Sequence, residues 1–111
     1  MIVYIIYEKA KYKEIPLAKK ILFNAKDEYI SDSIKGYTEY KNVAKAYVDV
    51  TPNTYMKKYI VSDRAYDLLS ITNPNKKIQC YTIARTNELI LLSTEDKLDR
   101  AKKGVEFYDY P

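Results

Sequence analysis

The stretch that decides the fold begins at residue 2 and reads Ile2-Val3-Tyr4-Ile5-Ile6-Tyr7. Every residue in it is β-branched or aromatic, which favours an extended backbone. The apolar residues stand at consecutive positions and not only at every second one. This pattern is typical of a strand that is buried on both faces. We therefore expect a central strand that other elements cover from two sides.

The region that follows this strand gives weaker signals. The polar residues 9–14 predict a loop. Pro16 is compatible with a short helix that holds proline in its first turn, or with a strand around 19–25, and we favour the strand. Residues 27–34 are typical of a short helix that ends at Gly36, because glycine commonly follows the last helical turn.

The middle of the chain predicts a strand and then a helix. Residues 43–50 alternate well enough for a strand. Thr51 then suits a helix cap and Pro52 the first helical position. One or two helical turns are therefore expected within residues 54–60.

A clearer helix is predicted over residues 64–71. Ser62 precedes it as a capping residue, and Ala65, Leu68 and Leu69 are spaced to form its inner side.

The boundaries of helices and strands are marked most clearly in the last third of the chain. It predicts a strand at residues 77–84, a turn at 86–87, a strand at 89–92, a helix at 94–103 and a final strand at 105–110. Ser93 and Asp96 form a capping-box pattern at the start of the helix, and Gly104 ends it. The whole chain, residues 1–111, therefore predicts one α+β domain with a single mixed β-sheet of four to six strands and two or three short flanking helices.

Thirteen tyrosines and no histidine limit the chemistry. Without imidazole, the usual proton shuttle near neutral pH and the commonest metal ligand are absent, and we expect no metal and no cofactor. Gly36 and Gly104 are the only glycines, so a phosphate-binding glycine loop is excluded. Cys80 is alone and fits a buried small hydrophobic residue better than a reactive thiol. No apolar run is long enough to span a bilayer and no leader is recognisable, so we expect a cytoplasmic protein.

Positive charge gathers in the first half of the chain. Residues 1–60 hold eleven lysines against seven acids, whereas residues 61–111 hold eight of each sign. The densest part contains Lys9, Lys11, Lys13, Lys19, Lys20 and Lys26. Such a cluster attracts a phosphate backbone, but lysines also protect exposed sheet edges from unwanted pairing. Both interpretations stay open.

A second candidate site combines aromatic rings with lysines. Tyr55 and Tyr59 share one face of a helix, Lys57 and Lys58 stand between them, and Arg64 follows. Rings that stack on bases and lysines that reach phosphates are the usual equipment for single-stranded nucleic acid. The alternative is that the rings pack inward and the lysines face water.

Asp63 and Asp67 are four residues apart and form a possible Mg²⁺ site. They equally fit the first turn of a helix, where acids offset the helix dipole.

The end of the chain reads IARTNELILLSTEDKL over residues 83–98 and GVEFY over residues 104–108. It resembles a family of small crenarchaeal-virus proteins that includes the viral anti-CRISPR ring nucleases. The resemblance implies a mixed sheet with flanking helices, a homodimer, and roles for Arg85 and for Glu88 as a general acid/base or loop anchor. The family carries a catalytic histidine in a Gly-His-Asp turn where this chain has Val61, Ser62 and Asp63. The resemblance thus implies the fold without the cleavage of cyclic oligoadenylate.

The resemblance implies a viral accessory protein of a hyperthermophilic archaeal host, and the lysines and tyrosines predict that it binds nucleic acid or an anionic nucleotide. No catalytic residue is assigned. The candidate binding residues are Lys9, Lys11, Lys13, Tyr55, Lys57, Lys58, Tyr59, Arg64, Arg85 and Glu88. One alternative is an interaction module that inhibits a host defence factor, and another is a histidine-independent nuclease or cyclic-nucleotide hydrolase. A homodimer is expected because a domain of this size has a limited core.

Overall fold

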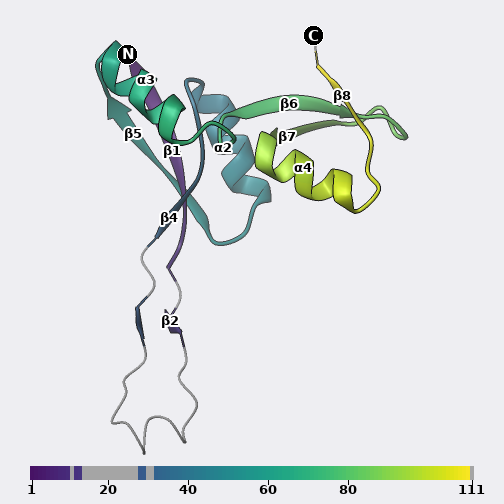
Figure 1. The fold of residues 1–111 in the computed structure, drawn as a ribbon, viewed down its shortest axis with the longest axis horizontal. Helices are drawn as coiled ribbons and strands as arrows, with labels where there is room; N and C mark the ends of the chain where they lie inside the picture. Colours follow the sequence, from purple (N-terminus) through teal and green to yellow (C-terminus); the bar gives the residue numbers. More distant parts are fainter. Residues whose placement is uncertain (11, 14–27, 30–31, 111) are drawn as a thin grey trace, which may run out of the picture.

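The described part of the chain folds as two three-stranded antiparallel sheets, a short two-stranded pair and three helices (Figure 1). The structure is a computed structural model that describes residues 1–10, 12–13, 28–29 and 32–110. The short pair consists of β2 (Tyr12–Lys13) and β3 (Glu28–Tyr29). The α+β class is confirmed, but the expected single mixed sheet is wrong, because the chain divides its strands between separate antiparallel sheets. The strand expected around 19–25 lies outside the described residues.

The first sheet has β1 (Ile2–Glu8) at its centre, between β4 (Ser33–Thr38) and β5 (Thr54–Ile60). Val3 and Ile6 of β1 point to opposite faces, and neither has any exposed surface. The prediction of a strand buried on both faces is confirmed.

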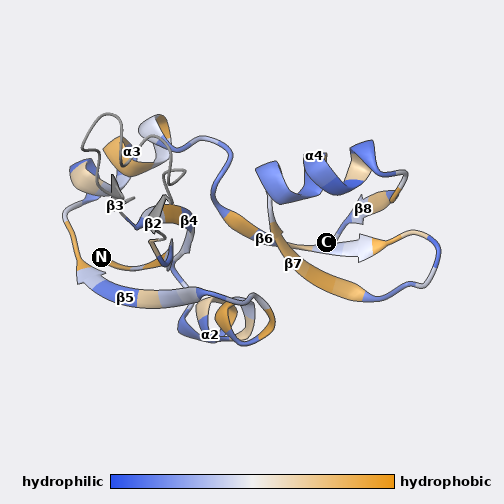
Figure 2. Ribbon diagram, turned by 90° about the horizontal axis from the view of Figure 1, so that it is seen from below, coloured by the Kyte–Doolittle hydropathy of each residue, from blue (hydrophilic) through white to orange (hydrophobic). Residues whose placement is uncertain are grey.

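Helices lie on both faces of this sheet (Figure 2). Tyr47 of α2 (Lys41–Val50) packs in one cluster with the buried side chains of β1. On the opposite face, Tyr66 of α3 (Asp63–Thr72) meets the edge of the Tyr37 ring at a centroid distance of 6.1 Å. The two helices cover the sheet unequally, because α2 contributes two buried residues, Ala44 and Tyr47, whereas α3 contributes none.

The second sheet has β6 (Ile78–Ile83) between β7 (Leu89–Ser93) and β8 (Phe107–Asp109). The helix α4 (Thr94–Lys102) follows β7 directly. Gly104 has a φ of 91°, a conformation that favours glycine after a helix. The predicted order of elements in this third of the chain is confirmed.

Both predicted caps of the later helices are present. The Ser62 side chain accepts a hydrogen bond from the Ala65 backbone N–H at 3.2 Å. Ser93 and Asp96 form the expected capping box, in which each side chain accepts from the other residue's backbone N–H. These two contacts fix where α3 and α4 begin.

Three other predictions for the first half are wrong. Residues 43–50 are helical, because Ala44 and Tyr47 stand three positions apart and both face the sheet. Residues 54–60 form strand β5 and not helical turns. The helix expected before Gly36 is absent from the described residues, and Gly36 lies inside β4.

The inner side of α3 also differs from the prediction. Ala65 and Leu68 are exposed, while Leu69 is only half-buried. The helix instead turns Tyr66 toward the sheet.

Gly36 allows the two sheets to approach each other. A Cβ atom at this position would lie 2.8 Å from Cδ1 of Ile78 and 3.0 Å from the carbonyl oxygen of Lys76. Ile78 is 4% exposed and belongs to the same core cluster as the buried side chains of β1. The glycine therefore serves close packing between the sheets and not a helix end.

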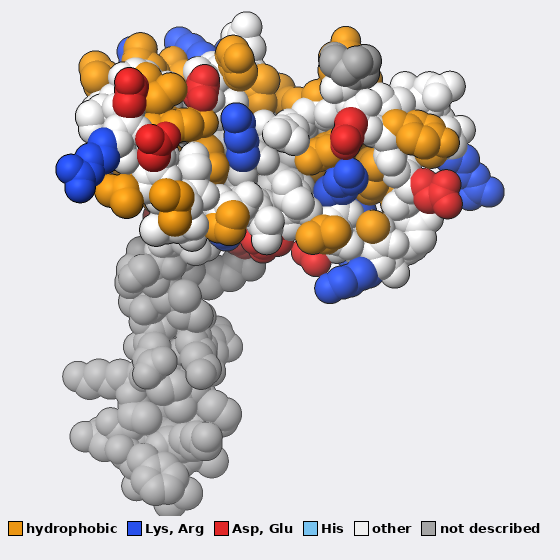
Figure 3. All heavy atoms as spheres, turned by 45° about the horizontal axis from the view of Figure 1, so that its top comes forward, with side chains coloured by type: hydrophobic (Ala, Val, Ile, Leu, Met, Phe, Trp, Pro, Cys, Tyr) orange, Lys and Arg blue, Asp and Glu red, His pale blue; other side chains and the backbone are white. Residues whose placement is uncertain are grey.

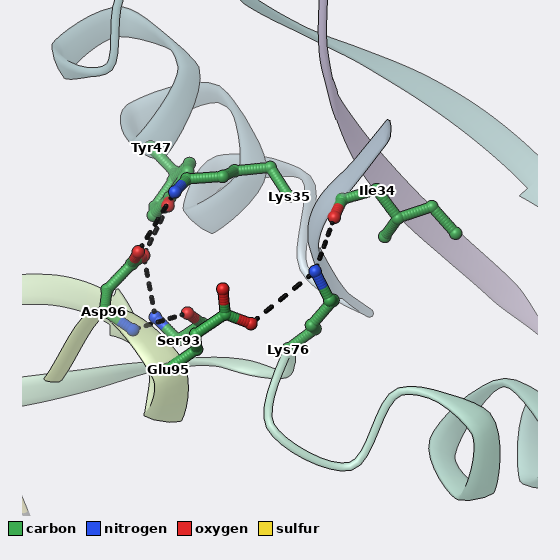
Figure 4. Close-up of polar contacts among 7 residues, drawn as sticks. All are labelled: Ile34, Lys35, Tyr47, Lys76, Ser93, Glu95 and Asp96. Carbon is green, nitrogen blue, oxygen red and sulfur yellow. Dashed lines mark hydrogen bonds and ion pairs between the residues drawn. The ribbon is translucent and has the colours of Figure 1, made fainter. Parts of the chain in front are cut away.

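A bulge next to Gly36 directs a lysine toward the second sheet. Ile6 pairs with Gly36 and Tyr7 pairs with Ile34, which leaves Lys35 as the extra residue of β4. Its Nζ lies 3.2 Å from Oδ1 of Asp96 in α4 (Figure 4).

Asp96 also connects α4 to α2. The Tyr47 hydroxyl donates a hydrogen bond to Oδ2 of Asp96 at 2.5 Å. Burial alone would raise the Asp96 pKa, but the Tyr47 hydrogen bond and the nearby Lys35 charge hold it below its ordinary value of 3.8. Burial and the same carboxylate raise the pKa of the Tyr47 phenol. The contact thus joins a neutral phenol to an ionised carboxylate at neutral pH.

A second set of polar contacts lies beside the first in Figure 4. The Nζ of Lys76 donates to the carbonyl oxygen of Ile34 at 2.9 Å and lies 3.6 Å from Oε2 of Glu95. Together with the Asp96 contacts, this lysine holds the second sheet and α4 against β4.

Candidate nucleic-acid interface

The face of the first sheet opposite α2 carries a group of tyrosines. Residues that lie directly opposite in adjacent strands share a face, and Tyr7 of β1 lies opposite Tyr55 of β5. Their rings are stacked, with centroids 5.4 Å apart and planes inclined by 23°. The Tyr7 and Tyr59 hydroxyls form a hydrogen bond of 2.8 Å. All three side chains are half-buried, so each keeps part of its surface at the solvent.

Lys57 adds a positive charge to this face. Because strand side chains alternate, Lys57 lies on the same face as its second neighbours Tyr55 and Tyr59. Its Nζ is 5.8 Å from the centroid of the Tyr7 ring and 6.0 Å from that of Tyr55, at the outer limit for a cation–π contact. The lysine is exposed. We refer to Tyr7, Tyr55, Lys57 and Tyr59 as the tyrosine face.

Asp32 anchors the outer end of the tyrosine face. Its carboxylate accepts hydrogen bonds from the Tyr55 hydroxyl and from the Ala10 backbone N–H. The Tyr55 hydrogen bond, followed by that from Ala10 and the charges of Lys57 and Lys9, holds the pKa of Asp32 below its ordinary value. The carboxylate is therefore ionised at neutral pH and fixes the Tyr55 ring by its hydroxyl.

The Tyr7 phenol is uncharged at neutral pH. Burial, the hydrogen bond to Tyr59 and the neighbouring phenols raise its pKa from 10.0 to about 12. The tyrosine face thus offers stacked rings and the Lys57 charge, with the Asp32 carboxylate at its outer end. Stacked rings suit bases, and a lysine suits a phosphate.

Among the predicted binding residues, the structure brings Tyr55, Lys57 and Tyr59 together. Tyr55 and Tyr59 share a face as predicted, although on a strand and not on a helix, because a spacing of four residues gives a common face in both. Lys57 joins them because side chains alternate along a strand. Lys58 lies on the opposite face, since it pairs with Tyr4 on the side that α2 covers. Lys9 extends β1, and its backbone N–H donates to the Asn53 carbonyl oxygen at 2.8 Å.

The other predicted residues lie elsewhere. Arg64 is in the first turn of α3. Arg85 and Glu88 lie between β6 and β7, at the far end of the second sheet from β5 (Figure 1). Lys11 lies outside the described residues, and only the backbone of Lys13, in β2, is described.

Sequence reasoning did not identify Tyr7 and Asp32 as parts of this site. Tyr7 belongs to a run that predicts a buried strand, and only the register with β5 shows that its ring stacks on Tyr55. No local pattern marks Asp32, because its partners are 22 and 23 residues away in sequence.

Arg85 lines an open cavity of about 550 Å³ together with Gly104, Glu106 and Tyr108. Arg85 and Glu106 are both exposed. Its lining contains one arginine, one carboxylate and one aromatic ring, so it lacks the pair of stacked rings found on the tyrosine face.

The two acids of the possible Mg²⁺ site, Asp63 and Asp67, both lie in α3. Asp63 is the first residue of α3, where it faces the helix dipole, and Asp67 follows one turn later. No group of three or more acidic or cysteine side chains in the described part of the chain is arranged to hold a metal ion. Cys80 is a free thiol and half-buried.

No protein-family model, curated protein or solved structure matches this chain. Among residues 1–10 and 32–110, no helix has the length and apolar character that a membrane crossing requires.

Proposed function

We propose that this protein binds single-stranded nucleic acid on the tyrosine face. The observation that carries the proposal is the stack of the half-buried Tyr7 and Tyr55 rings with Lys57 over both, on the sheet face opposite α2. Sheets that present aromatic rings bind unpaired bases by stacking, and a neighbouring lysine reaches the phosphates. A duplex hides the faces of its bases, so a single strand or a free anionic nucleotide fits better than a duplex.

The two adjacent lysines of β5 provide a matched test. Lys57 lies on the tyrosine face and Lys58 on the opposite one, and both are exposed. Replacing either with alanine removes the same charge from neighbouring positions. Fluorescence anisotropy with labelled single-stranded DNA and RNA at low salt should show weaker binding for Lys57→Ala than for Lys58→Ala.

The stacking contribution is tested at Tyr55. Loss of one ring–base stack costs about 1–3 kcal/mol, so Tyr55→Ala should weaken binding by roughly 5- to 150-fold. Binding of the wild-type protein should also weaken as salt rises. Equal effects of the two lysine variants, or no retention of any oligonucleotide at low salt, would refute the proposal.

A protein-interaction module is the second candidate. Leu68 and Ile71 of α3 are 55% and 72% exposed, and Ile60 at the end of β5 is 81% exposed. In Figure 3, hydrophobic side chains lie between single charged ones on the half of the molecule that carries α3. An exposed apolar surface of this kind suits a protein partner.

We also propose that the protein forms a homodimer and acts in the cytoplasm of a hyperthermophilic archaeal host, as expected from the sequence.

A further inference from the structure

The outer edge of β5 has no partner strand among the residues that the structure describes. The β1–β5 register runs without a bulge from Ile2 to Glu8, and β5 contains no proline. A regular, unpaired edge of this length is a template for a further strand, provided that the pairing accommodates its two lysines, which otherwise protect an edge. The question is which strand fits it.

The hydrogen bonds to β1 show which backbone groups point outward. The Lys9 N–H donates to the Asn53 carbonyl oxygen, and the Val61 N–H donates to the Met1 carbonyl oxygen, both at 2.8 Å. In an antiparallel pair, residues that exchange hydrogen bonds alternate with residues that do not. The odd-numbered residues of β5 therefore bond β1. The even-numbered ones, Thr54, Met56, Lys58 and Ile60, direct their N–H and C=O groups to the free edge.

The two lysines restrict how a second copy of this strand pairs. Around a two-fold axis perpendicular to the sheet, one residue lies opposite itself in the other copy. With Lys57 or Lys58 on the axis, two like charges are placed directly opposite, which is destabilising. With Met56 on the axis, Lys57 lies opposite Tyr55 and Lys58 opposite Thr54 of the second copy. This register pairs all residues from 54 to 58 without placing two lysines opposite each other.

We propose that the protein forms a homodimer through antiparallel pairing of β5 with β5 of a second copy, with Met56 on the two-fold axis. The outward backbone groups of Thr54, Met56 and Lys58 then form hydrogen bonds across the axis. Tyr55 and Lys57 of different copies meet in the pairs without hydrogen bonds, where the Cα atoms are closest, about 4.5 Å apart. The result is a six-stranded sheet.

The dimer has a consequence for the tyrosine face. An axis perpendicular to the sheet keeps equivalent faces on the same side, so the tyrosine faces of both copies join into one surface. A strand of nucleic acid long enough to cross the axis would contact both. The dimer itself does not depend on nucleic-acid binding.

The substitution Lys58→Pro distinguishes a loss of edge pairing from a loss of folding. The Lys58 N–H points outward, so Lys58→Pro removes a hydrogen-bond donor for the second copy and none for β1. Lys58→Ala keeps the N–H and is the matched control. Light scattering after size-exclusion chromatography should give twice the chain mass of 13.0 kDa for the wild type and Lys58→Ala. Lys58→Pro should give the monomer mass with an unchanged circular dichroism spectrum.

Cysteine cross-linking tests the register with folded protein. In a Cys80→Ser background, Met56→Cys places two thiols opposite each other across the axis, at a Cα separation compatible with a disulfide. Mild oxidation should give a covalent dimer for Met56→Cys and little for Lys57→Cys. A wild-type monomer at high concentration, a dimeric Lys58→Pro variant, or preferential cross-linking at residue 57 would each overturn the proposal. A wild-type monomer that binds an acidic extended peptide at β5 would assign the edge to another protein. The oligonucleotide assay is a separate measurement, so failure of the dimer and failure of nucleic-acid binding can be distinguished.

Discussion

Replacing Tyr47 with phenylalanine removes a single oxygen atom from the contact between α2 and α4. The Tyr47 side chain is 3% exposed, so the ring stays buried in the variant. Asp96 loses the hydrogen bond of 2.5 Å but keeps the Lys35 ion pair and its place in the capping box. The variant therefore isolates the hydroxyl–carboxylate contact.

The expected loss of stability follows from the charge of the acceptor. A hydrogen bond to an ionised group contributes about 1.5–3 kcal/mol. The Asp96 side chain is 16% exposed and retains Lys35, so we expect a loss of about 2 kcal/mol. For a chain of this size about 1 kcal/mol lowers Tm by roughly 4 °C, which gives a Tm lower by about 8 °C at neutral pH.

The pH dependence of this loss has a definite sign. The Asp96 pKa is lower in the folded protein than its ordinary value of 3.8. The stability from the ionised carboxylate is therefore complete above the ordinary value and disappears as pH falls through the lower, folded value. The Tm difference between wild type and Tyr47→Phe should shrink over that acidic range.

Thermal unfolding followed by circular dichroism at neutral and acidic pH measures both effects. Tyr40→Phe is the control, because this tyrosine is 67% exposed and the same atom is lost at the surface. Equal Tm values for wild type and Tyr47→Phe at neutral pH would refute the assigned contact. A difference that persists unchanged in acid would show that the Asp96 charge is not its cause.

Two further predictions concern the sheets. Gly36→Ala should lower the free energy of unfolding by about 1–3 kcal/mol, because its Cβ would crowd Ile78; in denaturant titrations, adding Ile78→Val should recover part of the loss. The neutral Tyr7 phenol should stabilise the protein fully below pH 10.0 and lose this effect as pH rises through about 12. In absorbance titrations, Tyr7→Phe should remove one late-ionising phenol; an unchanged late step would contradict this assignment.

The second half of the fold was predictable because its boundaries are marked by local chemistry. Ser62 and Ser93 accept backbone hydrogen bonds at the starts of α3 and α4, and Gly104 takes the positive φ that ends α4. Each signal acts within a few residues of the boundary it marks. No partner from another part of the chain is needed to interpret it.

The first half was not predictable in the same way because its signals have two meanings. Residues 43–50 contain apolar side chains at both alternating and helical spacings, and the helix is favoured because Ala44 and Tyr47 pack against the sheet. Gly36 is compatible with a helix end or with a close approach, and the approach of Ile78 decides between them. Tertiary packing overrides local preference at these positions.

The candidate site was predictable only along a single strand. The spacing of Tyr55 and Tyr59 gives a common face whether the segment is a helix or a strand, but Lys57 joins this face only in a strand. Tyr7 and Asp32 join this face through strand pairing and hydrogen bonds across long separations. Such contacts require the register between strands, which no window of the sequence contains.

The extra residue at Lys35 has a consequence for how this chain can vary in evolution. Losing this residue would leave β4 paired with β1 in the same register, because Gly36 would still lie opposite Ile6 and Ile34 opposite Tyr7. The side chains of β4 would keep their faces, but the bulge and the ion pair between Lys35 and Asp96 would be lost. Selection should therefore preserve the extra residue together with its positive charge, because strand pairing alone would tolerate its loss whereas the contact with α4 would not.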